Sequence, residues 1–201
     1  MIWNVWFITG FPVPSSASTK SQSLEIFIDA HFQHCPFAST PYLLPIMEPR
    51  TPVQNPKTAS PAHDILDVFA ERWSPRAFAD RPVEPEKIRR MLEAARWTMS
   101  SYNEQPWRYV VASRYDDPAA YERLLQCLNA FNQEWAQHAP VLMMSFYKAT
   151  FSKNDRPNRC APHDVGAASA ALTFQATAMD LYVHQMAGIE KDVVRETYDV
   201  P

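Results

Sequence analysis

Glycine is nearly absent from this chain of 201 residues, which contains only Gly10, Gly166 and Gly188. Phosphate-binding loops of the P-loop and dinucleotide-binding types need closely spaced glycines, because the backbone itself must approach the phosphate. The sequence therefore excludes both kinds of loop. Any phosphate that the protein binds must be held by side chains and by the backbone of other residues.

Cysteine is scarce, and neither sign of charge predominates. Cys35, Cys127 and Cys160 are odd in number and far apart, which favours a reducing, cytoplasmic location. Neither they nor His163 and His184 have the spacing of metal ligands, so no metal site is expected. A net charge of −3 indicates neither a nucleic-acid partner nor a membrane surface. The apolar stretch 2–8 is too short for a signal-peptide core or a membrane span.

The first 61 residues differ from the rest of the chain. They hold nine of its 18 prolines and few charges, and neither a helical nor an alternating pattern persists in them. We expect residues 1–61 to form a poorly ordered, proline-rich N-terminal extension. Residues 62–201 are expected to form one domain.

Hydrophobic spacing becomes regular from His63 onward. Pro85 suits the first turn of a helix, and apolar residues then follow at the spacing of one buried helix face. The short apolar runs 107–112 and 141–147 predict strands. The predicted order is a short helix at 65–69, a helix from Pro85 with Ile88, Met91, Leu92 and Ala95 buried, a strand at 107–112, helices at 118–128 and 131–138, a strand at 141–147 and a polar loop at 152–159.

A long apolar stripe runs through residues 163–185. Its members recur every three or four residues, which predicts one continuous helix that ends at Gly188. They are Val165, Ala168, Leu172, Ala176, Met179, Val183 and Met186. Residues 166–171 are all small, so another backbone could approach this helix closely. Two interpretations remain open, a buried central helix within one subunit and a helix at a subunit interface.

The run Arg72-Trp73-Ser74-Pro75-Arg76-Ala77-Phe78 carries the most functional information. A residue before proline is driven toward extended geometry, and residues two apart in an extended segment share a face. Arg72, Ser74 and Arg76 would then point to one side. Two guanidinium groups and a hydroxyl on one face form a binding site for phosphate or another polyanion. The alternative is a solvated loop with two unrelated arginines.

A second run, Ser100-Ser101-Tyr102-Asn103-Glu104-Gln105-Pro106-Trp107-Arg108-Tyr109-Val110-Val111, lies one amphipathic helix downstream. The two runs, in this order and at this separation, resemble the nitroreductase family of FMN-dependent oxidoreductases, from about Ala62 to Pro201. The resemblance implies an α+β fold with a mixed, mostly antiparallel sheet flanked by helices. It also implies a homodimer with FMN at its interface and NAD(P)H as co-substrate. The oxidant would be a nitroaromatic, a quinone or a similar small molecule.

The resemblance also assigns cofactor-binding roles in the first run. Arg72 and Ser74 would contact the FMN phosphate or ribityl chain, and Trp73 would contribute mainly its backbone. Arg76 would lie beside the flavin pyrimidine edge, where a guanidinium stabilises negative charge in a low-dielectric pocket. No catalytic side chain is expected, because FMN carries the redox chemistry.

Further cofactor contacts are implied in two later segments. Asn103 would bond to the flavin ring or ribityl chain, and Gln105 would either join it or only orient the loop. Backbone N–H groups of the segment Met186-Ala187-Gly188 would lie near flavin N5 and O4. The alternatives are a turn asparagine that bonds its own backbone and a plain helix cap.

One departure from the family pattern concerns the C-terminal side of the domain. Family members continue beyond the position of Pro201 with a further strand, basic residues for the phosphate and a tail that reaches the partner subunit. From this we expect weakened FMN binding and an exposed sheet edge. The alternative function is a truncated, non-catalytic family member that keeps the dimerisation core. Tyr121, Phe131 and Trp135 would either line a substrate pocket or only pack helices.

Overall fold

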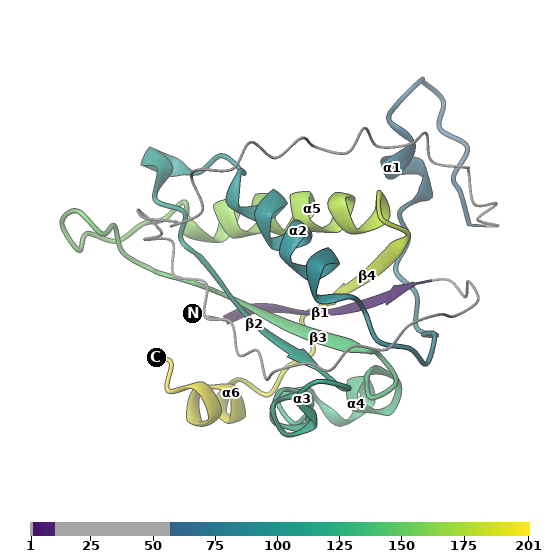
Figure 1. Cartoon of the computed structure of the whole chain (residues 1–201). Coiled ribbons are helices and arrows are strands. Elements are labelled where there is room, and N and C mark those ends of the chain that lie inside the picture. The colour runs from purple at the N-terminus through teal and green to yellow at the C-terminus, as the bar shows by residue number, and fades with distance from the viewer. Residues whose placement is uncertain (1, 11–56) are drawn as a thin grey trace, which may run out of the picture.

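A four-stranded sheet with helices on both faces forms the domain (Figure 1). The computed structural model describes residues 2–10 and 57–201, with side chains from residue 57 onward. The strands are β1 (Ile2–Gly10), β2 (Trp107–Ser113), β3 (Val141–Tyr147) and β4 (Leu181–Met186). They lie in the order β2-β3-β1-β4, and each neighbouring pair is antiparallel. This arrangement confirms the predicted α+β fold class.

Strand β3 is covered on both faces, which explains its uninterrupted apolar sequence. Val141 and Met143 face one hydrophobic core, whereas Leu142, Met144 and Phe146 face the other. The alternation follows directly from the period of two in a strand. The predicted bounds of this strand, 141–147, are confirmed.

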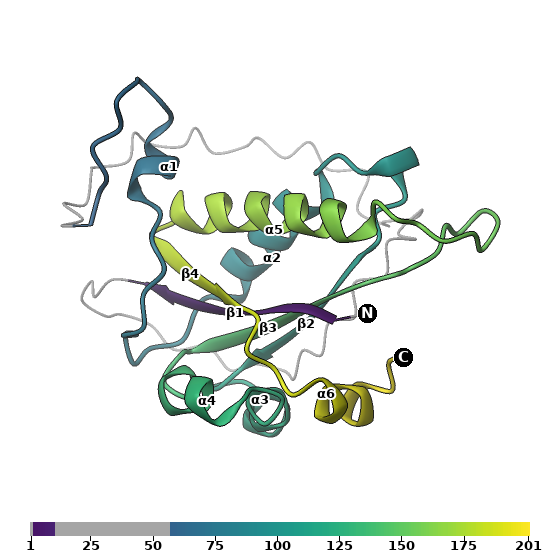
Figure 2. The same cartoon turned by 180° about the vertical axis from the view of Figure 1, so that it is seen from behind.

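The helices form two layers, one on each side of the sheet (Figures 1 and 2). On one side lie α1 (Asp67–Glu71), α2 (Pro85–Arg96), the 3₁₀ helix η1 (Ser101–Asn103) and α5 (Ala161–Thr177). On the other side lie α3 (Pro118–Leu125), α4 (Ala130–Ala136) and α6 (Lys191–Tyr198). No helix of the described part of the chain is long and apolar enough to cross a membrane.

Helix α2 forms as its sequence predicts. Pro85 occupies the first turn, where the missing N–H removes no hydrogen bond. Its buried residues are Ile88, Met91, Leu92 and Ala95. This face packs against α5, so the two helices share the core above the sheet.

The predicted helix over 163–185 is wrong from residue 178 onward. Helix α5 ends at Thr177, a turn with Asp180 at φ 58° follows, and Leu181–Met186 form strand β4. Val183 and Met186 continue the helical spacing of the stripe only by coincidence. Gly188 accordingly follows a strand and does not cap a helix.

The N-terminal segment also differs from the sequence-based expectation. Ile2–Gly10 form strand β1, which pairs with β3 on one side and with β4 on the other. Strands β3 and β4 therefore belong to one sheet through β1. Residues 11–56 lie outside the described part of the chain, so the expectation of poor order there stays a prediction.

Candidate functional site

The segment after α1 is extended, as the Ser-Pro step predicts. Arg72 caps α1 with φ −64° and ψ 129°, and its Nη1 donates to Ser74 Oγ at 3.5 Å. Pro75 is buried, whereas Ser74 and Arg76 on either side of it are exposed. The alternation of an extended chain therefore brings the Arg72 guanidinium and the Ser74 hydroxyl together at the surface.

His184 of β4 fixes this segment from below. Its Nδ1 lies 2.9 Å from the carbonyl oxygen of Pro75. Burial lowers the pKa of His184 below its ordinary value, and the nearby positive charge of Arg76 acts in the same direction. A neutral imidazole that donates its Nδ1–H to Pro75 satisfies both observations.

Arg76 lies against the aromatic rings of α4. Its guanidinium carbon is 5.7 Å from the centroid of Phe131 and 5.6 Å from that of Trp135, within the range of a cation–π contact. Trp135 in turn stacks on Phe78 at 6.1 Å and contacts His184 at 4.6 Å. The expectation that Arg76 joins Arg72 and Ser74 on one face thus needs amendment, because Arg76 extends toward α4.

The turn that contains Gly188 rests on the N-terminus of the same helix. Gly188 O accepts bonds from Asn129 N at 3.1 Å and from Asn132 Nδ2 at 3.2 Å. A Cβ atom at Gly188 would meet Asn132 Nδ2 at 2.0 Å. Only glycine permits this close approach, which is a different reason for glycine than the predicted helix cap.

Backbone donors remain available in this turn. Ala187 O accepts from Ile189 N at 3.0 Å, so the carbonyl groups of Ala187 and Gly188 are both used. Within residues 57–201, the N–H groups of Ala187 and Gly188 have no hydrogen-bond acceptor. Met186 packs on the core below the sheet. The turn therefore offers two donors in a fixed position close to α4.

One buried donor in the arginine segment also lacks a protein partner. Trp73 Nε1 is buried, and no acceptor in the described residues bonds to it. The indole ring packs against Tyr182 at 6.0 Å. An indole N–H without an acceptor is costly in an apolar setting, and the described residues do not offset this cost at Trp73.

The loop that carries Asn103 and Gln105 has an unusual backbone. Tyr102, Asn103 and Gln105 have φ values of 53°, 53° and 49°. Left-handed geometry costs a non-glycine residue about 1–2 kcal/mol, and such strain clusters at ligand sites. Gln105 Nε2 donates to Asn103 Oδ1 at 3.2 Å, which joins the two predicted cofactor residues.

Hydrogen bonds to surrounding elements hold the strained loop in place. Ser101 N donates to Asp164 Oδ2 at 3.0 Å, which attaches η1 to the N-terminal turn of α5. Gln105 N donates to Ser100 Oγ at 3.0 Å. Glu104 Oε1 accepts from the N–H and the hydroxyl of Ser152 at 2.7 and 2.6 Å.

The two groups of predicted site residues lie at opposite ends of α5. Asp164 holds the Asn103 loop at one end, while Phe174 packs on Phe69 of α1 at the other, with ring centroids 4.3 Å apart. The two contact points are about 15 Å apart at the usual rise per residue. Figure 2 shows α1 beside one end of α5 and the teal segment around residue 100 beside the other. One chain therefore does not bring the two groups together.

Comparison with known proteins identifies the fold. The sequence profile of the nitroreductase family matches residues 69–201, about two thirds of the chain. The chain belongs to the nitroreductase family.

Individual relatives agree with this assignment. A Ralstonia nicotianae protein described provisionally as an NADH dehydrogenase/NAD(P)H nitroreductase is 25% identical over 153 residues, 67% of this chain and 77% of the relative. A Thermus thermophilus NADH dehydrogenase is 35% identical over 100 residues, 50% of this chain and 42% of the relative. A crystal structure described as an oxidoreductase containing FMN superposes with a TM-score of 0.67 at 32% identity, covering 74% of this chain and 76% of that one.

Three residues of this nitroreductase-family oxidoreductase shape the candidate site without having been predicted. His184 supports Pro75, Asn132 holds Gly188, and Glu104 ties the strained loop to Ser152. Each acts through a contact with a residue far away in the sequence, so no local pattern reveals these contacts, although Glu104 itself lies within the second run. Tyr121, one candidate for a pocket, is buried and donates to Ala136 O and Ala139 O, which makes it a packing residue.

Proposed function

We propose that the protein is an FMN-dependent oxidoreductase that takes reducing equivalents from NAD(P)H. The observation that carries this proposal is a set of polar groups whose partners are missing from the described chain. The N–H groups of Ala187 and Gly188, in a turn at the protein surface, have no acceptor there. The Gly188 turn and the Arg76 guanidinium both contact α4, the turn through Asn132 and the guanidinium through Trp135. Ring and phosphate oxygens of FMN would supply acceptors for these groups.

Each residue would have a limited role. FMN would supply the redox chemistry, accepting a hydride from NAD(P)H and passing electrons to a nitroaromatic, a quinone or a similar small oxidant. Arg72 and Ser74 would bind its phosphate or ribityl chain through charge-assisted hydrogen bonds. Arg76 would stabilise negative charge at the pyrimidine edge. Ala187 and Gly188 would donate N–H bonds at the ring edge.

The Asn103 loop enters the proposal through a second copy of the chain. A two-fold axis across α5 would place the Asn103 loop of one copy beside the Arg72 segment of the other, because a two-fold axis pairs opposite ends of the same element. The outer face of α5 suits such a contact, since Gly166, Ala167, Ala170 and Ala171 are small and only half-buried. An added Cβ at Gly166 would meet nothing within 4 Å.

Exposed apolar side chains at both ends of α5 also favour a homodimer. Leu66 near α1 is 71% exposed, and Tyr102 in η1 is 93% exposed. Isolated apolar side chains are common on protein surfaces, but these two flank the α5 face that the two-fold arrangement would cover. The resulting cofactor site would be composite, with both subunits contributing side chains to each FMN.

Flavin binding tests the proposed function directly. We expect the purified protein to bind FMN, measured as quenching of flavin fluorescence on titration, and to oxidise NADPH or NADH with a quinone present. Arg72→Ala combined with Arg76→Ala should weaken FMN binding about 100-fold or more, since each lost charged hydrogen bond costs about 1.5–3 kcal/mol. Arg89→Ala together with Arg195→Ala removes two exposed arginines with helix-local ion pairs and is the matched control.

The outcomes separate the site assignment from the activity. Equal FMN affinity in the double variant and the wild type would reject the assignment of Arg72 and Arg76. A wild-type protein that binds no FMN would instead reject the proposed oxidoreductase function. FMN binding without NAD(P)H oxidation would indicate a flavin-binding protein without turnover.

A further inference from the structure

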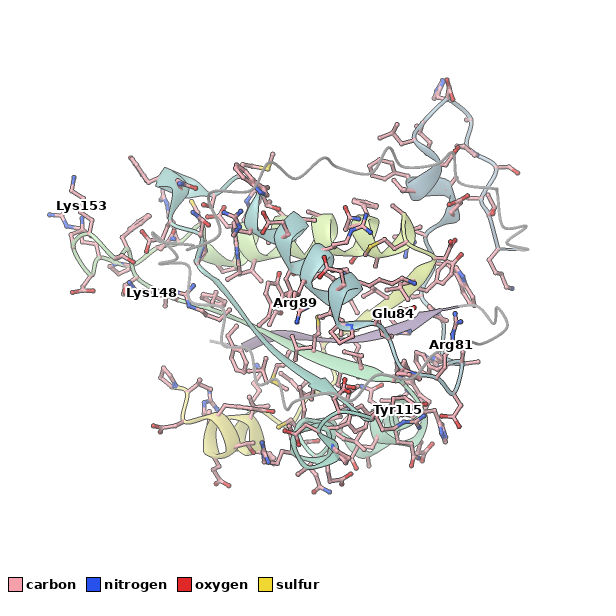
Figure 3. All side chains as sticks on the ribbon, in the orientation of Figure 1. Arg81, Glu84, Arg89, Tyr115, Lys148 and Lys153 are labelled. Carbon is pink, nitrogen blue, oxygen red and sulfur yellow. The ribbon has the colours of Figure 1, made fainter. Side chains whose placement is uncertain are left out.

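The hairpin that follows β3 packs on the strained loop of the candidate site. Tyr102 and Phe151 meet edge to face with ring centroids 5.8 Å apart. Lys148 N donates to Pro106 O at 2.9 Å, immediately after the loop. Figure 3 labels Lys148 where the hairpin leaves β3 and Lys153 at the outer part of the hairpin. Two segments separated by about 45 residues therefore form one unit at this end of α5.

Glu104 is the centre of this unit. It has helical backbone angles, φ −68° and ψ −27°, and lies between Asn103 and Gln105, which both have positive φ. Its side chain is only 10% exposed. The Oε1 atom accepts two short bonds from Ser152. Lys148 Nζ donates to the same hydroxyl at 2.7 Å and lies 3.9 Å from Glu104 Oε1.

This arrangement fixes the orientation of both neighbours of Glu104. In an isolated loop, Asn103 and Gln105 would relax out of the left-handed region, because that region is unfavourable for residues with a Cβ atom. Anchoring the residue between them opposes that relaxation. The amide heads of Asn103 and Gln105 then stay joined, with Asn103 Nδ2 and Gln105 Oε1 lacking partners in the described part of the chain.

We propose that Glu104 is a positioning residue for flavin binding, acting through the Ser152 and Lys148 anchor to hold Asn103 and Gln105 in their binding geometry. The inference rests on the proposed function, since it gives Asn103 and Gln105 a flavin to bind. Glu104 itself has no contact with the cofactor in this proposal. It lowers the free energy of the strained loop conformation before the ligand arrives, which is pre-organisation.

The test compares four variants by FMN titration and by amide hydrogen exchange. Glu104→Ala removes both acceptor bonds, and we expect it to raise the FMN Kd about tenfold and to speed exchange at Ser152 and Gln105. Glu104→Gln keeps an acceptor oxygen and should restore most of the affinity. Ser152→Ala should give an intermediate loss. Glu93→Ala, which breaks an exposed ion pair with Arg96 on α2, is the matched control and should change neither measurement.

Each outcome decides a separate point. A wild-type protein that binds FMN, with Glu104→Ala binding it equally well, overturns the positioning role. Faster exchange throughout the chain in Glu104→Ala also overturns it, because Glu104 would then stabilise the whole fold. If Glu104→Gln did not restore FMN affinity, the proposed role of the acceptor bonds would be overturned. A wild-type protein that binds no FMN rejects the proposed function, while local exchange at Gln105 still reports whether Glu104 anchors the loop.

Discussion

The two ends of α5 hold site residues in contrasting ways. At the C-terminal end, the Arg72 segment follows the rules of its own sequence, with extended backbone, buried proline and exposed polar neighbours. At the N-terminal end, the Asn103 loop contains three residues with positive φ and is held by contacts from distant elements. One end is stable by local preference, whereas the other depends on tertiary anchors. This difference indicates which changes each end tolerates.

The largest expected effect tests whether the two ends serve one cofactor. We expect Arg72→Ala with Arg76→Ala, and separately Asn103→Ala with Gln105→Ala, to abolish most FMN binding. When the two variants are co-expressed with different tags, the doubly tagged heterodimer contains one intact composite site. It should recover about half of the flavin that a wild-type dimer binds, since one of two symmetric sites is complete.

The same experiment can disprove the composite site. If the residues at both ends of α5 bound a cofactor within one chain, each chain of the heterodimer would have substitutions in its own site. The flavin content of the heterodimer would then equal that of the two variants alone. Failure to isolate any doubly tagged species, checked by size-exclusion chromatography, would likewise contradict the two-fold arrangement. The matched control is a heterodimer of wild-type chains with the two tags.

The sequence predicted much of the fold because most elements have a clear internal period. Ile88, Met91, Leu92 and Ala95 follow a helical period, and the run 141–147 is too short and continuous for a surface helix. The helical spacing predicted the wrong element at β4, where Val183 and Met186 matched the helical stripe by coincidence. Strand β4 shows no alternation that could have revealed it, since Leu181, Tyr182 and Val183 are all buried, and the turn at Asp180 that separates it from α5 has no glycine or proline.

The candidate site was predictable by residue type but not by arrangement. The Ser-Pro step predicted an extended chain after α1, which begins at Arg72 with ψ 129°, because this preference depends on neighbouring residues alone. The contact of His184 with Pro75 spans 109 positions in the sequence, and no local pattern reports it. The separation of Asn103 from Arg72 follows from the path of α5, which only the folded chain defines.

A smaller but still large effect is expected at the turn beside α4. Gly188→Ala places a Cβ atom 2.0 Å from Asn132 Nδ2, and Asn132 is 92% buried with its Nδ2 bonded to Gly188 O. We expect a loss of about 1–3 kcal/mol in unfolding free energy, measured by urea denaturation, because the overpacked site has to shift.

A double-mutant cycle sharpens this prediction. Asn132→Ala removes the atoms that the new Cβ would meet, at the cost of its own hydrogen bond. Gly188→Ala should therefore destabilise the Asn132→Ala protein far less than the wild type, a non-additive result expected of residues in contact. Additive losses in the cycle would show that the cost at Gly188 arises elsewhere.

In the strained Asn103 loop, the expected effect is a difference of about 1 kcal/mol in unfolding free energy between two variants of Tyr102. Tyr102→Gly and Tyr102→Ala both remove the ring and its contact with Phe151, so their difference isolates the backbone at φ 53°. The glycine variant should be more stable than the alanine variant by about 1 kcal/mol, because only glycine adopts left-handed geometry without strain. Thermal or urea unfolding measures this difference.

A position with ordinary helical geometry provides the control for this pair. Ala94 lies within α2, where Ala94→Gly should destabilise the protein by about 1 kcal/mol, the usual helix penalty of glycine. The sign of the glycine effect should therefore reverse between residue 94 and residue 102. The same sign at both positions would contradict the strained conformation of the Asn103 loop.

The smallest expected effect is a pH dependence at the unstrained end. Burial, with Arg76 nearby, lowers the pKa of His184 in the folded protein below its ordinary value of 6.5. The unfolded chain then binds a proton more readily than the folded chain as the pH falls through 6.5. The stability contributed by neutral His184 is complete above that pH and is lost progressively as the solution becomes more acidic.

His184→Asn isolates this contribution, because asparagine keeps an N–H donor for Pro75 O but does not titrate. Melting temperatures measured from pH 7.5 to 5.5 should fall more steeply in the wild type than in the variant. Parallel slopes in His184→Asn and the wild type would mean that the folded and unfolded chains protonate His184 equally readily, which would contradict the lowered pKa of His184 in the folded protein.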